Sequence, residues 1–347
     1  MKWLSFKQKA MENFHMFQKE PEEEETWEDL DNGTEETMED SGEEEDEEQQ
    51  WDPELLIRCD SLVKIYKSED VEVMALQGLD LEIKRGELMA VIGKSGSGKS
   101  TLMNMIGGLE RPSAGKLYID GRDLFALSDS EMVGYRNKTV GFVWQKSSRN
   151  LVPYMTAVEN IEVPMYFTKK SAEDMRKRAM ELLERVGMCH KKDAYPGQMS
   201  GGEQQRIAIA VALANEPDIL LADEPTGAVD TKTSNKIQDL FRTLNKELGI
   251  TIIIVTHDIS LANKVGRVVM ISDGKISTEK IMKEEYQRVI NSLDGEAING
   301  KDSHEEYSVL DKARRLQLNE EMLAAAGIDS NKVKVQVIDD KVVISKE

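Results

Sequence analysis

Short apolar runs and amphipathic stretches alternate along the chain from Leu55 to about residue 280. The runs LMAVI (88–92) and ITIIIV (250–255) are apolar at nearly every position, and DILLAD (218–223) is apolar between its two terminal aspartates. Such runs are typical of strands that are buried on both faces in a parallel sheet. Alternation of these strands with amphipathic helices predicts a single α/β domain over residues 55–280.

The pattern before residue 55 predicts two segments of different character. Residues 1–19 carry aromatic and apolar side chains at helical spacing, with lysines elsewhere around the wheel. This predicts either an amphipathic helix that lies on a membrane or a partner, or a transient helix in a disordered tail. Residues 20–52 are too charged to offset the entropy of ordering, so we expect a disordered acidic tether.

Beyond residue 280 the strand and helix pattern weakens, and residues 281–347 are predicted to form a small C-terminal appendage. Residues 305–327 have the spacing of an amphipathic helix that ends at Gly327. The run VKVQVIDDKVVIS (333–345) alternates in two halves around Asp339, Asp340 and Lys341, which predicts a β-hairpin.

Charge and composition narrow the classes of function. The formal charge is −20, but 18 acidic residues and no Lys or Arg lie between Glu20 and Gln50, so the rest of the chain is nearly neutral. A chain without a basic stripe is not expected to bind nucleic acid. Cys59 and Cys189 are far apart, which indicates reduced thiols, and no apolar run is long enough to span a bilayer. We therefore expect a cytoplasmic chain.

A glycine-rich segment, GKSGSGKST (93–101), follows the first buried strand and opens a helical run. This order of strand, turn and helix predicts a loop whose backbone N–H groups and helix N-terminus bind phosphate. Lys99 is expected to bridge the β- and γ-phosphates, and the Ser100 hydroxyl to bind Mg²⁺. The residues expected at the nucleotide in this segment are Gly93, Lys94, Ser95, Gly96, Ser97, Gly98, Lys99, Ser100 and Thr101.

Two other buried strands end in residues suited to phosphoryl chemistry. Asp223 ends the run DILLAD and is expected to hold Mg²⁺, while Glu224 is placed to polarise the attacking water. His257 follows the run ITIIIV and is expected at the same edge of the sheet, beside the γ-phosphate. Lys99, Glu224 and His257 are therefore the predicted catalytic residues.

The residues MSGGEQQR (199–206), just upstream of the carboxylate strand, resemble the signature motif of ABC ATPases. A helix that begins after Ser200, Gly201 and Gly202 would offer a second anion site. The resemblance implies an ABC-type P-loop ATPase domain with an antiparallel β subdomain and a helical subdomain. It also implies that this second site grips the ATP of an opposing subunit in a head-to-tail dimer, formed with a second copy or with a paired ATPase.

The resemblance assigns roles to three further residues. Tyr66 matches the aromatic residue that stacks on adenine, and Gln145 matches the glutamine that contacts Mg²⁺ and links the site to the helical subdomain. Asp230 matches the aspartate that communicates across the dimer. The sequence departs from the family pattern at Met199, Glu203 and Gly266, but the Ser and Gly donors of the signature are retained.

Residues 150–165 and the stretch after the phosphate loop are similar to the ATPases of lipoprotein release, macrolide export and bacitracin resistance. This similarity implies an ATP- and Mg²⁺-dependent subunit at the cytoplasmic face of the membrane, which drives a separately encoded permease docked near Gln145 to Pro164. The alternative is an ATP-dependent regulator or scaffold that acts on a membrane partner without transporting cargo. A soluble ABC ATPase of DNA repair or translation is less favoured, because the chain has one cassette and no coiled-coil insertion.

Overall fold

The computed structural model describes residues 51–68, 71–146, 149–227, 229–258, 264–286, 303–318, 320–329 and 332–346. The chain divides into two units, Met1–Gln49 and Gln50–Glu347, and all described residues belong to the second. The predicted helix over residues 1–19, and residues 20–50 of the tether predicted over residues 20–52, therefore lie outside the described residues. The prediction of a disordered tether is wrong at Trp51, near its end, because the Trp51 ring packs on Tyr118 with ring centroids 6.3 Å apart.

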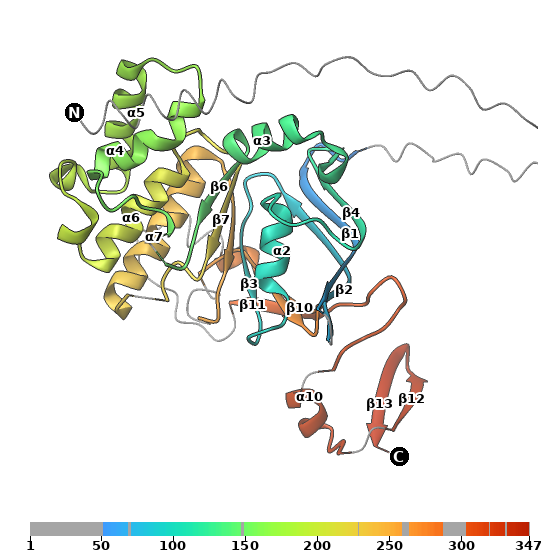
Figure 1. Ribbon diagram of the computed structural model, residues 1–347. Helices are drawn as coiled ribbons and strands as arrows, with labels where there is room; N and C mark the ends of the chain where they lie inside the picture. The colour runs from blue at the N-terminus through green and yellow to red at the C-terminus, as the bar shows by residue number, and fades with distance from the viewer. Residues whose placement is uncertain are drawn as a thin grey trace, which may run out of the picture. The chain divides into compact units, whose positions relative to one another are not determined.

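The larger of the two main sheets carries the expected parallel strands (Figure 1). Across the described residues, its strand order is β11-β10-β9-β3-β8-β7-β6. Neighbours from β9 to β6 are parallel, whereas β10 and β11 run antiparallel. The strands are β3 (Leu88–Ile92), β6 (Val140–Val143), β7 (Ile219–Asp223), β8 (Thr251–Val255), β9 (Arg267–Ser272), β10 (Lys275–Met282) and β11 (His304–Ser308). The three runs that the sequence marks as buried strands, β3, β7 and β8, are confirmed.

The smaller main sheet is antiparallel, with the order β2-β1-β4-β5 among the described strands. Its strands are β1 (Leu55–Lys67), β2 (Glu72–Lys84), β4 (Ala114–Ile119) and β5 (Arg122–Asp123). This sheet is the antiparallel subdomain that the family resemblance implies.

Alternate residues of the buried strands belong to two separate hydrophobic cores. In β3, Met89 and Val91 pack toward the antiparallel sheet and α2, whereas Ala90 and Ile92 pack toward the helical side. The period-two geometry of a strand produces this division.

The helices are α2 (Lys99–Ile106), α3 (Asp129–Lys138), α4 (Ala157–Glu162), α5 (Ala172–Arg185), α6 (Gly201–Ala212) and α7 (Thr231–Leu248), with 3₁₀ turns η1 (Leu124–Ala126), η3 (Val163–Phe167), η4 (Cys189–Lys191) and η5 (Pro196–Gln198).

The predicted helix over residues 305–327 is wrong in its first part. His304–Ser308 is strand β11, which pairs antiparallel with β10 from Thr278 to Met282. Backbone hydrogen bonds with β10 favour a strand over residues 304–308, despite the helical spacing of the apolar residues in this part of the sequence. Helix α10 is limited to Glu320–Ala325, although Gly327 does adopt the left-handed conformation expected after a helix.

The predicted C-terminal hairpin is confirmed by strands β12 (Val333–Ile338) and β13 (Lys341–Lys346), which pair along their length. Asp339 and Asp340 form the turn, and both have positive φ, as a type I′ hairpin turn requires at its two central residues. None of the helices in the described ranges has the length and apolar character needed to cross a membrane.

Candidate functional site

The phosphate loop connects β3 to α2, and its conformation depends on glycine at position 98. Gly98 precedes the first residue of α2 and has φ of 105°, in the region that L side chains rarely adopt. A Cβ at this position would stand 2.5 Å from the Ala75 carbonyl oxygen and 2.8 Å from a methyl group of Leu76. The loop is therefore packed directly against β2, and no larger residue fits there.

The side chains of the loop leave polar groups available for a phosphate. Lys99 Nζ donates hydrogen bonds to the carbonyls of Gly93 at 2.9 Å and Lys94 at 2.8 Å, so its ammonium group lies across the mouth of the loop. Burial lowers the pKa of Lys99, against the opposing effect of Glu224 and Asp223. Ser97 Oγ is buried and has no hydrogen-bond partner among the described residues. A buried hydroxyl without a partner is unfavourable unless a ligand supplies one.

Asp223 is the last residue of β7 and Glu224 follows it, so two carboxylates lie at the carboxyl end of this strand, as the sequence predicts. Burial raises the pKa of Asp223, and the adjacent Glu224 raises it further, while Lys99 and Arg149 act in the opposite direction. Glu224 has φ of 46°, a left-handed conformation that costs energy in a non-glycine residue. Its N–H donates to the Val255 carbonyl at 2.8 Å, which ties this strained residue to β8.

His257 and Glu224 form a direct pair in the structure. His257 Nδ1 lies 2.8 Å from Glu224 Oε1, and the Thr256 hydroxyl donates a 3.5 Å bond to Glu224 Oε2. Thr256 is fully buried, whereas the His257 side chain is 73% exposed. The Glu224 carboxylate is therefore bonded through one oxygen to the buried Thr256 hydroxyl and through the other to the solvent-exposed His257 ring. The sequence did not single out Thr256, and its position immediately before His257 was the available signal.

The pair predicts a measurable shift in the titration of His257. The hydrogen bond and charge of Glu224 raise the pKa of His257 above its ordinary value. A raised folded pKa adds stability that is present below the ordinary pKa of histidine and is lost as pH rises through the raised value. We expect an NMR titration of the nucleotide-free chain to show this raised pKa, and Glu224→Gln to lower it. An unchanged His257 pKa in that variant would contradict the pairing.

Gln145 follows β6 in a loop that is closed by Asn150. The Asn150 side chain accepts from the Trp144 N–H and donates to the Trp144 carbonyl, both at 3.3 Å. Gln145 is exposed, and its Nε2 lies 3.6 Å from the place where a Cβ on Gly227 would stand. Because Gly227 donates its N–H to the Glu224 carbonyl, Gln145 reaches the segment that carries the carboxylates.

Tyr66 lies at the end of β1 beside α2. Its hydroxyl donates to Glu110 Oε2 at 2.5 Å and lies 3.4 Å from Thr101 Oγ1, and its side chain remains partly exposed. Burial, followed by the bond to Glu110, raises the pKa of Tyr66. The Tyr66 ring is thus fixed next to the helix that begins at the phosphate loop, while its role in stacking on adenine stays a prediction.

Ser200 is the N-cap of α6, and its described contacts are with the first turn of that helix rather than with the phosphate loop. Its Oγ accepts from the Glu203 N–H at 3.3 Å, while Glu203 Oε2 accepts from the Ser200 N–H at 2.8 Å. This capping box gives Glu203, one of the departures from the family pattern, a clear role in forming the helix end.

Gly202 packs closely on the helix that follows Asp230. A Cβ on Gly202 would stand 2.2 Å from the Thr233 methyl group. Thr233 also donates its hydroxyl to Asp230 Oδ2 at 2.7 Å, and Asp230 accepts from the Thr233 N–H as the N-cap of α7. Gly202 thus packs against the first turn of α7, which Asp230 caps, and the sequence did not predict this contact because it joins residues about thirty positions apart.

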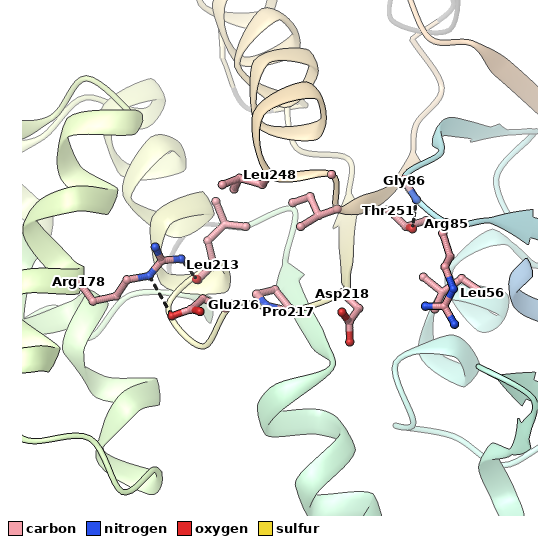
Figure 2. A pocket seen from close by; sticks show the side chains of 12 residues that line it. Leu56, Arg85, Gly86, Arg178, Leu213, Glu216, Pro217, Asp218, Leu248 and Thr251 are labelled. Atoms are coloured by element: carbon pink, nitrogen blue, oxygen red, sulfur yellow. Dashed lines mark hydrogen bonds and ion pairs between the residues drawn. The ribbon is translucent and has the colours of Figure 1, made fainter. Parts of the chain in front are cut away.

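A separate pocket of about 360 Å³ lies at the amino ends of the parallel strands, whereas the phosphate loop and the carboxylates lie at their carboxyl ends (Figure 2). Gly86, Asp218 and Thr251, which line it, lie before or at the start of β3, β7 and β8. Two of its charged side chains are already paired, with Arg178 Nε 3.7 Å from Glu216 Oε1. The pocket shares no residue with the phosphate loop or its carboxylates.

Comparison with known proteins decides the family. Residues 76–227 match the family model described as ABC transporter. An uncharacterized ABC transporter ATP-binding protein of Thermotoga maritima is 46% identical over 61% of this chain and 90% of its own length. The chain belongs to the ABC transporter ATP-binding proteins.

This ABC ATPase is also similar to a lipoprotein-releasing system ATP-binding protein, LolD, of Pseudoalteromonas translucida, with 40% identity over 65% of this chain and 97% of that protein. Among solved structures, it matches the dimeric post-hydrolysis state of the ATP-binding cassette MJ0796 bound to ADP and Pi, with 42% identity and a TM-score of 0.61. That match covers 66% of this chain and 99% of the cassette. The predicted fold and ATPase family are confirmed, and membership of this family supports ATP as the nucleotide that the chain binds.

Proposed function

We propose that this ABC ATPase works as a head-to-tail dimer that closes around ATP and drives a separately encoded membrane permease from the cytoplasmic face. The observation that carries the proposal is the convergence of the Lys99 ammonium with Asp223, Glu224 and His257 at one sheet edge. Ser200 and Gly202 form a second helix start whose described contacts leave it apart from this group. In a head-to-tail dimer, the opposing subunit would place its own helix start at the phosphate that the phosphate loop of this subunit binds, because a helix N-terminus favours an anion.

The side chains present suit Mg²⁺. Ser100, Gln145 and Asp223 offer a hydroxyl, an amide and a carboxylate, and oxygen donors of this kind together with phosphate oxygens are the usual ligands of Mg²⁺. When bound, Mg²⁺ would neutralise charge on the β- and γ-phosphates. Lys99 would leave the Gly93 and Lys94 carbonyls for the phosphates, and the Ser97 hydroxyl would gain its missing partner.

Glu224 is the group best placed to act on the attacking water. Its Oε1 accepts from or shares a proton with His257, and its backbone is held by Val255 and Gly227. In-line attack on the γ-phosphate needs a fixed carboxylate that orients the water, together with positive charge that stabilises the developing anion. Glu224 meets the first need, and Lys99 and a protonated His257 meet the second.

A role as a regulator or scaffold on a membrane partner would use the same residues, so the partner must be identified directly. We expect the tagged Glu224→Gln protein, purified from native membranes with ATP and Mg²⁺, to retain a permease that mass spectrometry identifies. A tagged Lys99→Ala protein, which lacks the phosphate-binding ammonium, serves as the control with weakened nucleotide binding.

Recovery of a permease in the presence of ATP would support the proposed coupling. Recovery of a membrane protein whose outer domain contacts another enzyme and no cargo would favour the regulatory role. If neither variant retains a membrane protein under conditions that keep the chain folded, the proposed permease coupling is wrong.

A further inference from the structure

The segment after β11 runs from the sheet edge toward the phosphate loop. Val309 donates its N–H to the Ser277 carbonyl at 3.1 Å, which continues the pairing of β11 beyond its last residue. Leu310 and Leu316 then form an antiparallel bridge that closes a small loop. We call residues 309–318 the strap.

Asp311 fastens the strap to the first residue of β10. Asp311 Oδ2 lies 3.2 Å from Lys275 Nζ, and both side chains are mostly buried, with 17% and 24% exposed. The carboxylate also accepts from the Arg315 backbone N–H at 2.9 Å and from Arg315 Nε at 2.7 Å. These bonds hold the pKa of Asp311 at about 2, so the carboxylate stays charged throughout the physiological range.

Gln317 fastens the other end of the strap to the turn between β9 and β10. Its Nε2 lies 3.3 Å from Ser272 Oγ and 3.4 Å from Asp273 Oδ2. The strap therefore contacts this turn on both sides, through Lys275 and through Ser272 with Asp273.

The same turn supports the phosphate loop from behind. Gly274 donates its N–H to the Ser97 carbonyl at 3.1 Å and accepts from the Gln77 N–H at 3.0 Å. The backbone of Gly93 also approaches β9 so closely that a Cβ would stand 2.3 Å from the Ile271 carbonyl oxygen. A shift of the turn would therefore act directly on Ser97, and a shift of the adjoining end of β9 would act on Gly93.

We propose that the strap positions the phosphate loop, with Lys275 and Asp311 as positioning residues that act through the β9–β10 turn on Ser97. The inference rests on the nucleotide-binding role proposed for that loop. The strap preorganises the loop in the shape that binds phosphate, so that nucleotide does not have to order it. Its effect is on nucleotide affinity rather than on the chemical step, because no strap residue reaches Glu224 or His257 in the described contacts.

The test is the affinity of the full chain for ADP with Mg²⁺, measured by isothermal titration calorimetry. We expect Lys275→Met to raise the dissociation constant roughly three- to tenfold, the size usual for substitutions that act through an intervening element. At saturating ATP, kcat should stay within about twofold of wild type, because the reacting groups are untouched. Asp311→Asn should have a similar effect, and the double variant should add little to either single change.

Lys280→Met is the matched control. Lys280 pairs with Glu306 at 2.8 Å between β10 and β11, so this variant also loses an ion pair of the C-terminal segment, but at the end of β10 away from the turn. Both lysine variants should lose similar thermal stability, and only Lys275→Met should bind ADP more weakly.

Equal ADP affinity in wild type and Lys275→Met would overturn the strap proposal, and so would an equal loss in Lys280→Met. A wild-type chain that binds no ADP would instead overturn the proposed nucleotide site itself, and the strap proposal with it.

Discussion

Glu224→Gln is expected to lower ATP hydrolysis roughly 100- to 10,000-fold, the range usual for loss of a positioned general base. The amide keeps the shape of the carboxylate, and its oxygen can still meet His257, which lies 2.8 Å from Glu224 Oε1. It cannot take a proton from water. ATP binding should persist, because the ammonium of Lys99 and the backbone of the phosphate loop are unchanged.

The measurement combines phosphate release with size-exclusion chromatography in ATP and Mg²⁺. The variant should run as a persistent dimer, since the bound ATP that closes the dimer is no longer consumed. Glu247→Gln is a suitable control because Glu247 also engages a cation, Arg185 at 2.7 Å, on α7 and outside the site. Rapid turnover by Glu224→Gln would remove Glu224 from its proposed role.

Gly202→Ala is expected to reduce hydrolysis roughly tenfold or more, and to lower the free energy of unfolding by about 1–3 kcal/mol through overpacking. The new methyl group would stand 2.2 Å from the Thr233 methyl group. Thr233 cannot easily rotate away, because its hydroxyl is bonded to Asp230. The start of α6 must then move relative to α7, and Ser200 moves with it.

A second substitution tests whether the Thr233 methyl group is the cause of this loss. Thr233→Ser removes the obstructing methyl group and keeps the hydroxyl for Asp230, so Gly202→Ala/Thr233→Ser should regain most of the lost activity. Gly197→Ala is the control, because a Cβ there meets no atom within 4 Å. If the double variant is no more active in ATPase assays than Gly202→Ala alone, the steric clash is not the cause.

Those parts of the fold that depend on local sequence were predictable. Residues 88–92 and 251–255 are buried strands because nearly every side chain is apolar, and this holds wherever the strand sits in the sheet. The glycine-rich loop between β3 and α2 was also predictable, because its glycines and its place between strand and helix are local features, while its binding of phosphate stays a prediction.

Features that depend on contacts between distant residues were not predictable in the same way. Strand β11 exists because β10 offers it a partner, whereas its own sequence, HEEYS, has no apolar alternation. The bond from Tyr66 to Glu110 and the contact of Gly202 with Thr233 likewise join segments that only the fold brings together. The sequence therefore identified the candidate residues of the site, but not the neighbours that hold them.

Strand β11 also has a consequence for synthesis of the chain on the ribosome. Until residues 304–308 have emerged, β10 is the last of the described strands at its side of the larger sheet and presents unpaired N–H and C=O groups along that edge. An open edge of this kind is a template for pairing with another nascent chain. A ribosome that stalls between residues 282 and 304 should therefore release a chain that is prone to aggregate, although its phosphate loop and carboxylates are already complete.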